Sequence, residues 1–383
     1  MTDLSSKRLA ADILIIAPYC GSSSDKWFSP GRQRKLFQVE SLFVSLGYSF
    51  QRFSISPDQP KTGQFDWESL CSSSWPPVRF VQLFFNAFWA GGTQVLSDEP
   101  QWIWIYNTRL AEAMVALALL IRKPKVKIFL QLEDLPAARL ANAGVRGRLD
   151  SFSSKMLSRR ADCVSAVSLP VALAFSQLTS FSADRIVLLP PLLDDNYRLK
   201  VACRQPPFGD SCTTIVYAGG YGAEKGIDDL LAAFSHLPVP GFRLLLLGPI
   251  PYSLRVQLSG QSGIEILGMV PIERLFLAYA EADILVNPHR PILNSSYVFP
   301  FKLIEIMASG ALPLSTAMPG LESFGLPSDC IFFGCRQLSE KLVNASRIWR
   351  LNRQRLERLA QQLRESHSMA HARDVLYHRL GIE

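Results

Sequence analysis

Short apolar segments alternate with segments of helical spacing along most of this chain. DILIIAPY, QWIWIYN and VKIFLQLED have the length and composition of buried strands. Between the first two, QRKLFQVESLFVSLG has helical spacing and ends at Gly47. Strands joined through helices run parallel, because each helix returns the chain to the same edge of the sheet. The alternation therefore predicts an α/β fold, with a parallel sheet covered by helices on both faces.

A polar, proline-containing segment divides the alternation into two series. DDNYRLKVACRQPPFGDSC has neither the helical nor the strand period, which suits a linker. After it, strand-like TTIVYAGG, helical GIDDLLAAF and strand-like FRLLLLGP begin a second series. We therefore predict an amino-terminal domain over 1–193, a linker over 194–212, a second domain over 213–350, and a basic helical tail over 351–383 that can pack back on the first domain.

The composition supports two such domains and excludes several classes of protein. The 383 residues are 48% hydrophobic and 19% charged, which suffices for large cores and argues against global disorder. The net charge of +7 is mild for this length and does not indicate nucleic-acid binding. Two β/α domains joined by one linker form a cleft, and we expect ligands at the carboxyl ends of the strands that face it.

Cysteine usage and hydropathy bear on the compartment. Seven irregularly spaced cysteines without a C-x-x-C pair fit reduced thiols in a cytoplasmic protein better than disulfides or a zinc site. The amino terminus lacks a long apolar core and an A-x-A site, so we expect no signal peptide. The longest apolar stretch, from Ala113 to Ile121, falls short of the roughly 20 residues that span a bilayer. We expect a cytoplasmic protein that contacts the inner face of the membrane only peripherally.

The segment SSYVFPFKLIEIMASGALPLST carries the most specific chemical signal. Pro300 and Gly310 are typical of the start and end of a helix, and Lys302 and Glu305 share one face of it. Free backbone N–H groups at a helix start favour an anion, and Lys302 adds positive charge. Glu305 can accept hydrogen bonds from two vicinal hydroxyls. A phosphate beside a sugar diol describes a nucleotide, whereas the alternative is an amphipathic helix with a solvated Lys/Glu pair.

A glycine-rich loop after a predicted strand is the second candidate. In VYAGGYGAEKGIDDLLAAF, small residues including Gly219 and Gly220 let the backbone approach a pyrophosphate, and Lys225 lies near the next helix start. The spacing fits neither the Walker pattern nor G-x-G-x-x-G. Taken alone, the loop is more simply explained as a tight turn with an exposed lysine.

Two further groups of polar residues follow predicted strands. Arg290 lies after DILVNP and is suited to bidentate phosphate contact, whereas His289 beside it is more simply a capped loop residue. Glu133 and Asp134 follow another strand, where adjacent acids are often solvated or cap the next helix, and YNTR from 106 to 109 can line the same cleft.

The sequence also contains basic clusters, but it lacks two common metal-binding motifs. Three basic clusters and the aromatic stretch 78–89 can together form an interfacial patch for a lipid-linked substrate; the clusters are FSPGRQRKLF, which contains Arg32, Arg34 and Lys35, RKPKVK and SSKMLSRR. Each one singly is better explained as a solvated face or a core segment. The sequence has no H-E-x-x-H, and no D-x-D motif follows a strand. We therefore expect no bound metal and no other cofactor.

Taken together, these segments resemble glycosyltransferase family 4, whose members are retaining enzymes of the GT-B fold. YAGGYGAEKGIDDLLAAF is similar to that family's glycine loop, and EILGMVPIERLFLAYAEADILVNP and FPFKLIEIMASGALPLSTAMPG follow in the family's order. LEDLP is similar to a subgroup with an E-D pair in the first domain and an NPR…FPSK-like donor motif. The resemblance implies two Rossmann-like, doubly wound domains that face a cleft.

The resemblance also implies roles for particular residues. Lys225 corresponds to the lysine that contacts the donor diphosphate, and Glu305 to the glutamate that binds the nucleotide ribose. Lys302 and Arg290 match basic positions that face the donor phosphates or sugar. The donor-binding residues are then Gly219, Gly220, Lys225, Tyr297, Lys302 and Glu305, and the catalytic candidates are Glu133, Asp134 and Arg290.

Three positions depart from the family's pattern. Tyr297 stands where the first glutamate of the E-x7-E motif is expected, and Gly220 replaces the arginine that usually follows the first glycine of the loop. Glu133 stands at the common position of a histidine in the first domain. These departures alter the residues expected around the donor phosphates and the reacting sugar.

We therefore expect transfer of a sugar from a nucleotide-diphosphate donor to a hydroxyl acceptor, with retention of configuration and without metal. The expected acceptor is a glycan or lipid-linked glycan of surface polysaccharide synthesis. Three alternatives stay open: a sugar-nucleotide epimerase of the same fold, a catalytically inactive subunit that binds a partner glycosyltransferase, and a two-lobed solute-binding protein, against which the missing export signal counts.

Overall fold

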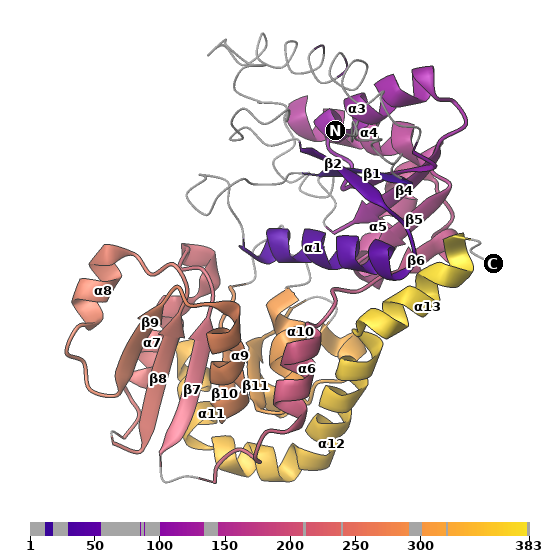
Figure 1. Ribbon diagram of the computed structural model, residues 1–383. Coiled ribbons are helices and arrows are strands. Elements are labelled where there is room, and N and C mark those ends of the chain that lie inside the picture. Colours follow the sequence, from indigo (N-terminus) through magenta and orange to yellow (C-terminus); the bar gives the residue numbers. More distant parts are fainter. Residues whose placement is uncertain are drawn as a thin grey trace, which may run out of the picture. The chain divides into compact units, whose positions relative to one another are not determined.

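The computed structural model places the chain in two compact units (Figure 1). Unit 1 comprises Met1–Pro190 with Ala372–Glu383, and unit 2 comprises Pro191–His371. The structure describes residues 12–17, 30–54, 85, 88, 100–133, 145–209, 212–238, 240–290, 301–318 and 321–380. Within these ranges, every helix is too short or too polar to cross a lipid bilayer.

Unit 1 is built on a six-stranded parallel sheet with the order β2-β1-β3-β4-β5-β6. Its strands are short and apolar, as the alternation predicts. The chain reverses its direction of winding between β1 and β3, so the sheet is doubly wound. The strands are β1 (Ile13–Ala17), β2 (Phe50–Ser54), β3 (Trp102–Tyr106), β4 (Lys127–Leu132), β5 (Cys163–Ala166) and β6 (Ile186–Leu188).

The helices of unit 1 cover the sheet with their apolar sides. Every residue of β1 and β3 is buried, and α3 buries ten of its residues against the sheet and α4. The ring of Trp104 packs edge-on against that of Phe43, with centroids 5.8 Å apart. Continuous apolar strands require cover on both faces, and the helices supply it. They are α1 (Pro30–Ser45), α3 (Leu110–Arg122), α4 (Val145–Ser158) and α5 (Leu169–Thr179).

Unit 2 repeats the design with its own core and the strand order β12-β11-β10-β7-β8-β9. All its strand pairs are parallel, and the winding reverses between β7 and β10. The strands are β7 (Thr213–Ala218), β8 (Phe242–Leu247), β9 (Ile264–Gly268), β10 (Ile284–Asn287), β11 (Leu312–Thr316) and β12 (Ile331–Phe332). The helices between them are α7 (Ile227–Phe234), α8 (Tyr252–Leu258), α9 (Ile272–Glu281) and α10 (Phe301–Ala308), and α11 (Gly334–Val343) follows the last strand.

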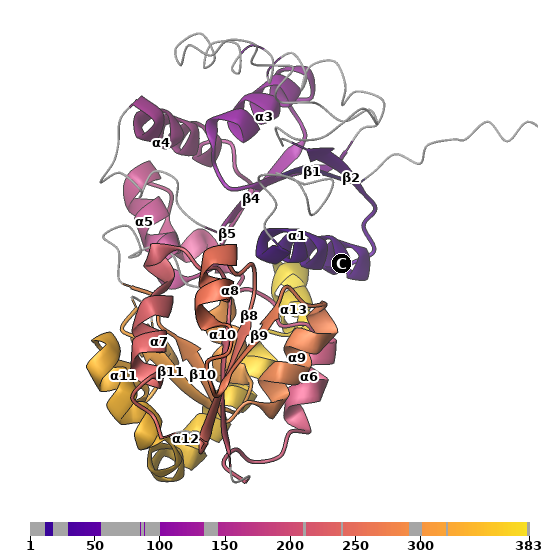
Figure 2. The same cartoon turned by 90° about the vertical axis from the view of Figure 1, so that its left-hand side faces the viewer.

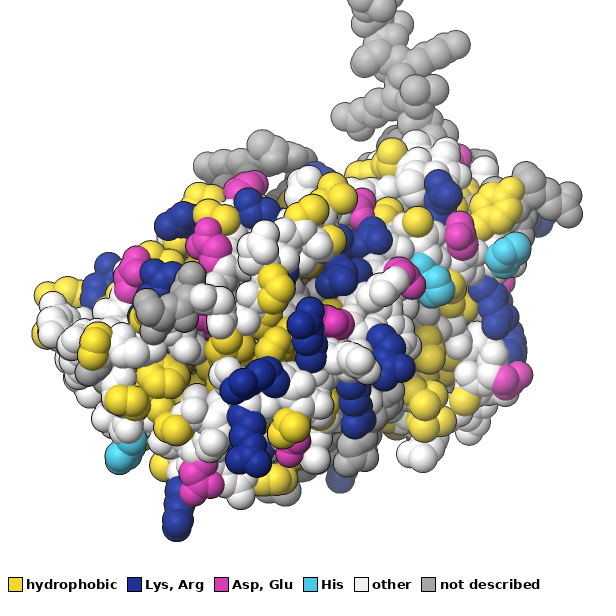
Figure 3. Space-filling view, turned by 90° about the horizontal axis from the view of Figure 1, so that it is seen from below, with side chains coloured by type: hydrophobic (Ala, Val, Ile, Leu, Met, Phe, Trp, Pro, Cys, Tyr) yellow, Lys and Arg dark blue, Asp and Glu magenta, His cyan; other side chains and the backbone are white. Residues whose placement is uncertain are grey.

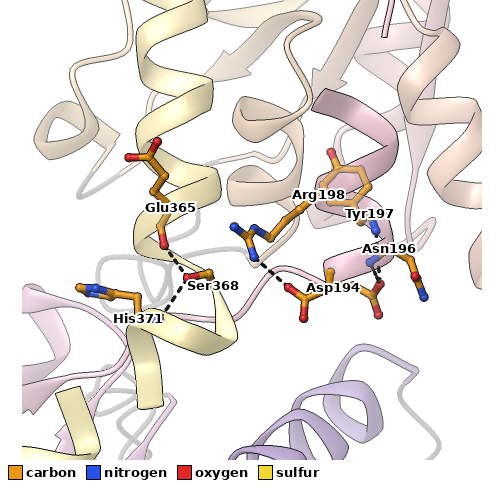
Figure 4. Close-up of polar contacts among 8 residues, drawn as sticks. Asp194, Asn196, Tyr197, Arg198, Glu365, Ser368 and His371 are labelled. Atoms are coloured by element: carbon orange, nitrogen blue, oxygen red, sulfur yellow. Dashed lines mark hydrogen bonds and ion pairs between the residues drawn. The ribbon is translucent and has the colours of Figure 1, made fainter. Parts of the chain in front are cut away.

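The segment predicted to be a linker contains a helix that periodicity alone did not reveal. Helix α6 (Asp195–Ala202) begins at Asp194, whose carboxylate accepts hydrogen bonds from the backbone N–H groups of Asn196 and Tyr197 (Figure 4). The cap compensates for a short, polar sequence of little helical periodicity. Tyr197 is fully buried in the core of unit 2, where its ring lies 4.9 Å from that of Phe276. Residues 195–202 therefore form part of unit 2.

The carboxyl-terminal segment is helical, as predicted, but it is divided. Helix α12 (Ala345–Ser366) buries Trp349, Leu356 and other apolar residues in the core of unit 2. Helix α13 (Met369–Leu380) starts anew, since the Ser368 hydroxyl accepts from the His371 N–H and donates to the Glu365 carbonyl (Figure 4). From Ala372 the chain belongs to unit 1.

Candidate functional site

The carboxyl edge of the unit 2 sheet brings together several of the residues predicted from the sequence. The glycine loop leaves β7, and the loop with His289 and Arg290 leaves β10. Strands β7 and β10 are neighbours at the point where the winding reverses. Loops that diverge from such a point leave a crevice, which is where open α/β sheets bind their ligands.

Gly219 gives space to the side chain of Lys302. A Cβ atom added at Gly219 would lie 1.9 Å from the Lys302 Nζ atom and 3.2 Å from the Tyr217 hydroxyl. The Lys302 ammonium also lies 5.0 Å from the centroid of the Tyr217 ring, a cation–π contact. The sequence suggested that this glycine lets the backbone approach a pyrophosphate. In the structure, its missing side chain admits the cation.

The charge of Lys302 is costly in its surroundings. Burial is the largest cause that lowers the pKa of its ammonium, to about 8, and the positive charge of Lys225 lowers it further. Glu305, one helical turn along α10, acts in the opposite direction. Two cations therefore converge at the carboxyl edge of the sheet with one buried carboxylate near them. An anion placed between the lysines would relieve their repulsion.

Lys225 is held beside His289, which sequence reasoning treated as a capped loop residue. The Lys225 Nζ lies 3.3 Å from the His289 Nε2 and 3.6 Å from a Glu224 carboxylate oxygen. The His289 Nδ1 lies 3.0 Å from the Arg290 carbonyl oxygen, which fits a neutral ring that donates from Nδ1 and accepts at Nε2. Burial first, and then the charge of Lys225, lowers the pKa of His289, consistent with that neutral form.

The two loops are locked together behind these side chains. Gly226 has a φ of +64°, and a Cβ there would lie 1.9 Å from the Pro288 carbonyl oxygen. The Arg290 N–H donates to the Glu224 carbonyl oxygen at 2.9 Å. A left-handed residue in contact with neighbouring backbone has to be glycine. The K-G pair that the sequence singled out thus fixes the position of Lys225 relative to the loop after β10.

Arg290 has a carboxylate partner in the structure. Its Nε donates to the Asp229 carboxylate at 2.9 Å, and its Nη2 lies 4.0 Å from Asp228. The hydrogen bond and charge of Asp229 raise the pKa of Arg290. The guanidinium therefore ties its loop to the first turn of α7, an arrangement that the sequence did not reveal. Contact between Arg290 and a donor phosphate stays a prediction. For such contact the guanidinium must either bind the phosphate and Asp229 together or release Asp229.

Glu305 and Gly220 complete the part of the site in unit 2. Glu305 is only 4% exposed, and the Tyr197 hydroxyl donates a hydrogen bond to its backbone carbonyl, which connects α6 with α10. Gly220 is open: the nearest atom to an added Cβ is the Lys225 Cε at 3.8 Å. A Cβ atom at position 220 therefore meets no close neighbour, so crowding at that atom does not explain why the loop has glycine where the resemblance predicts arginine.

The carboxyl edge of the unit 1 sheet holds a separate polar cluster around Glu133. The Lys35 ammonium lies 2.5 Å from one Glu133 carboxylate oxygen, and the Gln131 amide donates to the other at 2.8 Å. The Glu133 N–H donates to the Asn107 side chain, and Asn107 itself has a φ of 68°. Lys35, which the sequence placed in a basic cluster, is therefore part of this site. Asp134 and Tyr297 lie outside the described residues.

The described residues contain no group of three His, Cys, Asp or Glu side chains that could hold a metal ion. Independence from metal stays a prediction.

Residues 212–364 match the family model described as glycosyl transferases group 1. This segment includes every described residue of the unit 2 site. No curated protein sequence matches the chain.

Three solved structures similar to the chain are distant from it in sequence. Sucrose-phosphate synthase from Thermosynechococcus elongatus has a TM-score of 0.65 and 17% identity, over 97% of this chain and 99% of that one. The trehalose-phosphate synthase (UDP-forming) of Burkholderia xenovorans, solved with glucose-6-phosphate, has a TM-score of 0.67 and 13% identity, over 96% and 100%. Anabaena HepE, solved with UDP, has a TM-score of 0.62 and 15% identity, over 97% and 99%.

The class that the fold defines is GT-B, with two Rossmann-like parallel α/β units, and the predicted fold is confirmed. The match of residues 212–364 further relates unit 2 to the group 1 glycosyltransferases.

Proposed function

We propose that the protein is a retaining glycosyltransferase that transfers a sugar from a nucleotide-diphosphate donor to a hydroxyl acceptor. The observation that carries the proposal is the ammonium of the half-buried Lys302 in the space left by Gly219, with Lys225 near enough to lower its pKa. Glu224 pairs with Lys225 and Glu305 favours the charge of Lys302, but the pKa of Lys302 is still lowered, so an anion bound between the two lysines would stabilise them further. The match of this segment to group 1 glycosyltransferases makes a donor diphosphate the natural anion.

The same arrangement suits the chemistry of the reaction. When the bond from the sugar to the diphosphate breaks, negative charge builds on the leaving oxygens, and fixed cations stabilise it without moving. Lys302 and Lys225 supply this charge, so the proposal requires no metal. In this proposal Glu305 binds the ribose hydroxyls. The donor phosphates compete with the Asp229 carboxylate for the Arg290 guanidinium, which then contacts them.

In unit 1, Glu133 and Asp134 contact the acceptor or the donor sugar in this proposal. The Lys35 and Gln131 contacts hold the Glu133 carboxylate in one orientation. We assign no residue as a general base, because retention in this family is thought not to need a conventional one. The proposed acceptor is a glycan or lipid-linked glycan of surface polysaccharide synthesis, reached from the cytoplasmic face of a membrane.

Nucleotide-dependent thermal stabilisation tests the donor site first. Binding to the native state raises the melting temperature, so UDP, GDP, ADP and dTDP should be compared on one preparation. We expect one of them to stabilise the protein and Glu305→Ala and Lys225→Ala to abolish the effect. Lys200→Met, on the exposed side of α6, is the control and should keep it.

Product analysis then separates the proposal from its alternatives. With the nucleotide sugar identified, transfer that requires an added acceptor and retains the anomeric configuration supports the proposal. Conversion of the nucleotide sugar without any acceptor would indicate an epimerase instead. Failure of all four nucleotides to bind, together with co-purification of an active glycosyltransferase, would indicate an inactive subunit.

A further inference from the structure

The outer side of α4 carries a stripe of basic residues around an exposed aromatic ring. Arg148, Phe152 and Lys155 follow the helical spacing of i, i+4 and i+7, Arg159 comes directly after the last residue of the helix, and all four are exposed. Phe152 is 59% exposed. The opposite side, with Ser153, Ser154 and Leu157, is buried against the rest of unit 1. The solvent-exposed side of the helix therefore combines cations with a large apolar side chain.

A second basic segment adjoins this stripe. The Arg160 guanidinium donates to the Pro124 carbonyl oxygen at 3.2 Å, which brings the end of α4 to the segment after α3. Arg122 and Lys125 in that segment are exposed, as is Ile121 at 64%. Figure 2 shows α3 and α4 next to each other in unit 1, in agreement with their contact. We call the combined surface the α4 face; it consists of Ile121, Arg122, Lys125, Arg148, Phe152, Lys155, Arg159 and Arg160.

The cations of the α4 face are not neutralised by acids. Among the described residues, none of the six lysines and arginines of the α4 face makes an ion pair. The nearby exposed Asp162 instead accepts from the Ile128 N–H. Helix α12 is different: Arg353 pairs with Glu357 at 2.8 Å, and Arg355 donates to the Gly325 carbonyl. Basic side chains on that side of the molecule, seen in Figure 3, are thus partly engaged with neighbours.

We propose that the α4 face docks on an anionic lipid surface. Unpaired Lys and Arg side chains are attracted to anionic headgroups, and their attractions add. An aromatic and an aliphatic side chain among those cations can enter the boundary between headgroups and acyl chains, as in helices that lie in the plane of a membrane. Nucleic acid or a polyanionic glycan would satisfy the cations but would leave Ile121 without a partner.

The direction of α4 places one end of this surface near the polar cluster of unit 1. Strands β4 and β5 are parallel, so the chain between them returns from the carboxyl edge to the amino edge of the sheet. Arg148, near the start of α4, therefore lies toward the edge that holds Glu133, whereas Arg159, Arg160 and residues 121–125 lie toward the amino edge. A membrane along the whole helix reaches the carboxyl edge at its Arg148 end, which suits a lipid-linked acceptor if the proposed transferase activity holds. The docking itself does not depend on that activity.

Vesicle sedimentation tests the α4 face. The full-length protein should bind vesicles that mix phosphatidylglycerol with phosphatidylcholine and should bind phosphatidylcholine vesicles far more weakly, with affinity falling as salt rises. Replacing Arg148, Lys155 and Arg159 together by Glu should lower the affinity at least about tenfold. Phe152→Ser should lower it several-fold and leave the salt dependence unchanged.

The matched control reverses three exposed arginines of α12, Arg347, Arg350 and Arg358, to Glu, which changes the net charge equally. Its affinity should stay within about twofold of the wild type, since these residues lie outside the α4 face. The proposal would be overturned by an equal loss of vesicle affinity in both triple variants, by no preference for anionic vesicles, or by an unchanged affinity in Phe152→Ser. Unchanged melting temperature and nucleotide response in the α4 variants would show that folding and the unit 2 site are intact.

Discussion

At the scale of single residues, Gly219 and Lys302 form a complementary pair. One residue lacks a side chain where the other places a buried ammonium. Neither the glycine pattern nor the Lys/Glu helical face predicts this, since 83 positions separate the two residues in the chain. One glycine of the loop therefore accommodates a side chain of the protein itself.

Gly219→Ala should therefore displace the Lys302 side chain and abolish nucleotide stabilisation. The added methyl group overlaps the Lys302 Nζ, which is the far end of a flexible side chain, so we expect the ammonium to move and the free energy of unfolding to fall by no more than about 1 kcal/mol, the low end of overpacking costs. Gly220→Ala next to it is the matched control, because its Cβ meets nothing closer than 3.8 Å. Denaturant unfolding and the nucleotide-induced shift measure both effects. Equal behaviour of the two variants would contradict the role of Gly219.

The buried Lys302 also predicts an opposition between stability and binding. Its pKa falls from 10.5 to about 8, so below pH 8 the native state bears a cost of roughly 3 kcal/mol for keeping it charged. As pH rises from 8 to 10.5, the unfolded state holds more protons at this group than the native state, and the cost disappears. Lys302→Met should therefore raise the free energy of unfolding at pH 7, and this gain should shrink between pH 8 and pH 10.5. The same substitution should abolish nucleotide binding.

The pH dependence of wild-type nucleotide binding gives an independent measurement. Affinity should fall as pH rises through about 8, because Lys302 then loses its proton and its attraction for the diphosphate. Calorimetric titration from pH 6.5 to 9 measures the decline. A flat profile would mean that Lys302 does not contact the anion.

At the scale of elements, α6 shows how one cap produces a helix from a weakly patterned segment. Asp194→Ala removes the acceptor for two N–H groups and should cost about 1 kcal/mol of the free energy of unfolding. Asp195→Ala loses only an exposed pair with Arg198 and should cost less than about 0.5 kcal/mol. Urea unfolding of both variants distinguishes the cap from a general loss of charge.

At the scale of the molecule, the two units have separate hydrophobic cores. Leu130→Ala, in the centre of the unit 1 sheet, should cost about 2–5 kcal/mol in unit 1 and leave the nucleotide affinity of unit 2 unchanged. Leu246→Ala, its counterpart in β8, should weaken the protection of unit 2 amides and lower that affinity. Hydrogen exchange measured by peptide mass spectrometry, with calorimetry for affinity, tests both. Equal loss of protection in both units would contradict separate cores.

Much of the fold follows from local patterns in the sequence. Apolar runs such as residues 13–17 and 102–106 form buried strands, and the helical spacing of residues 110–122 forms a buried helix, because strand and helix periods are local properties. Pro300 lies outside the described residues, but the helix after it ends near Gly310, which has the left-handed φ of +80° expected there. The polar 194–202 segment was the exception, since its helix depends on a cap and on burial of Tyr197.

The sequence by itself determined the two β/α series and which residue types stand at the strand ends. Only the tertiary structure decided their partners: Lys302 with Gly219, Arg290 with Asp229, Glu133 with Lys35, and the α4 stripe with residues 121–125. The physical reason is that periodicity depends on how each segment packs against a core, whereas these contacts join residues from 36 to 98 positions apart. Such contacts depend on strand order and helix placement, which no local pattern specifies.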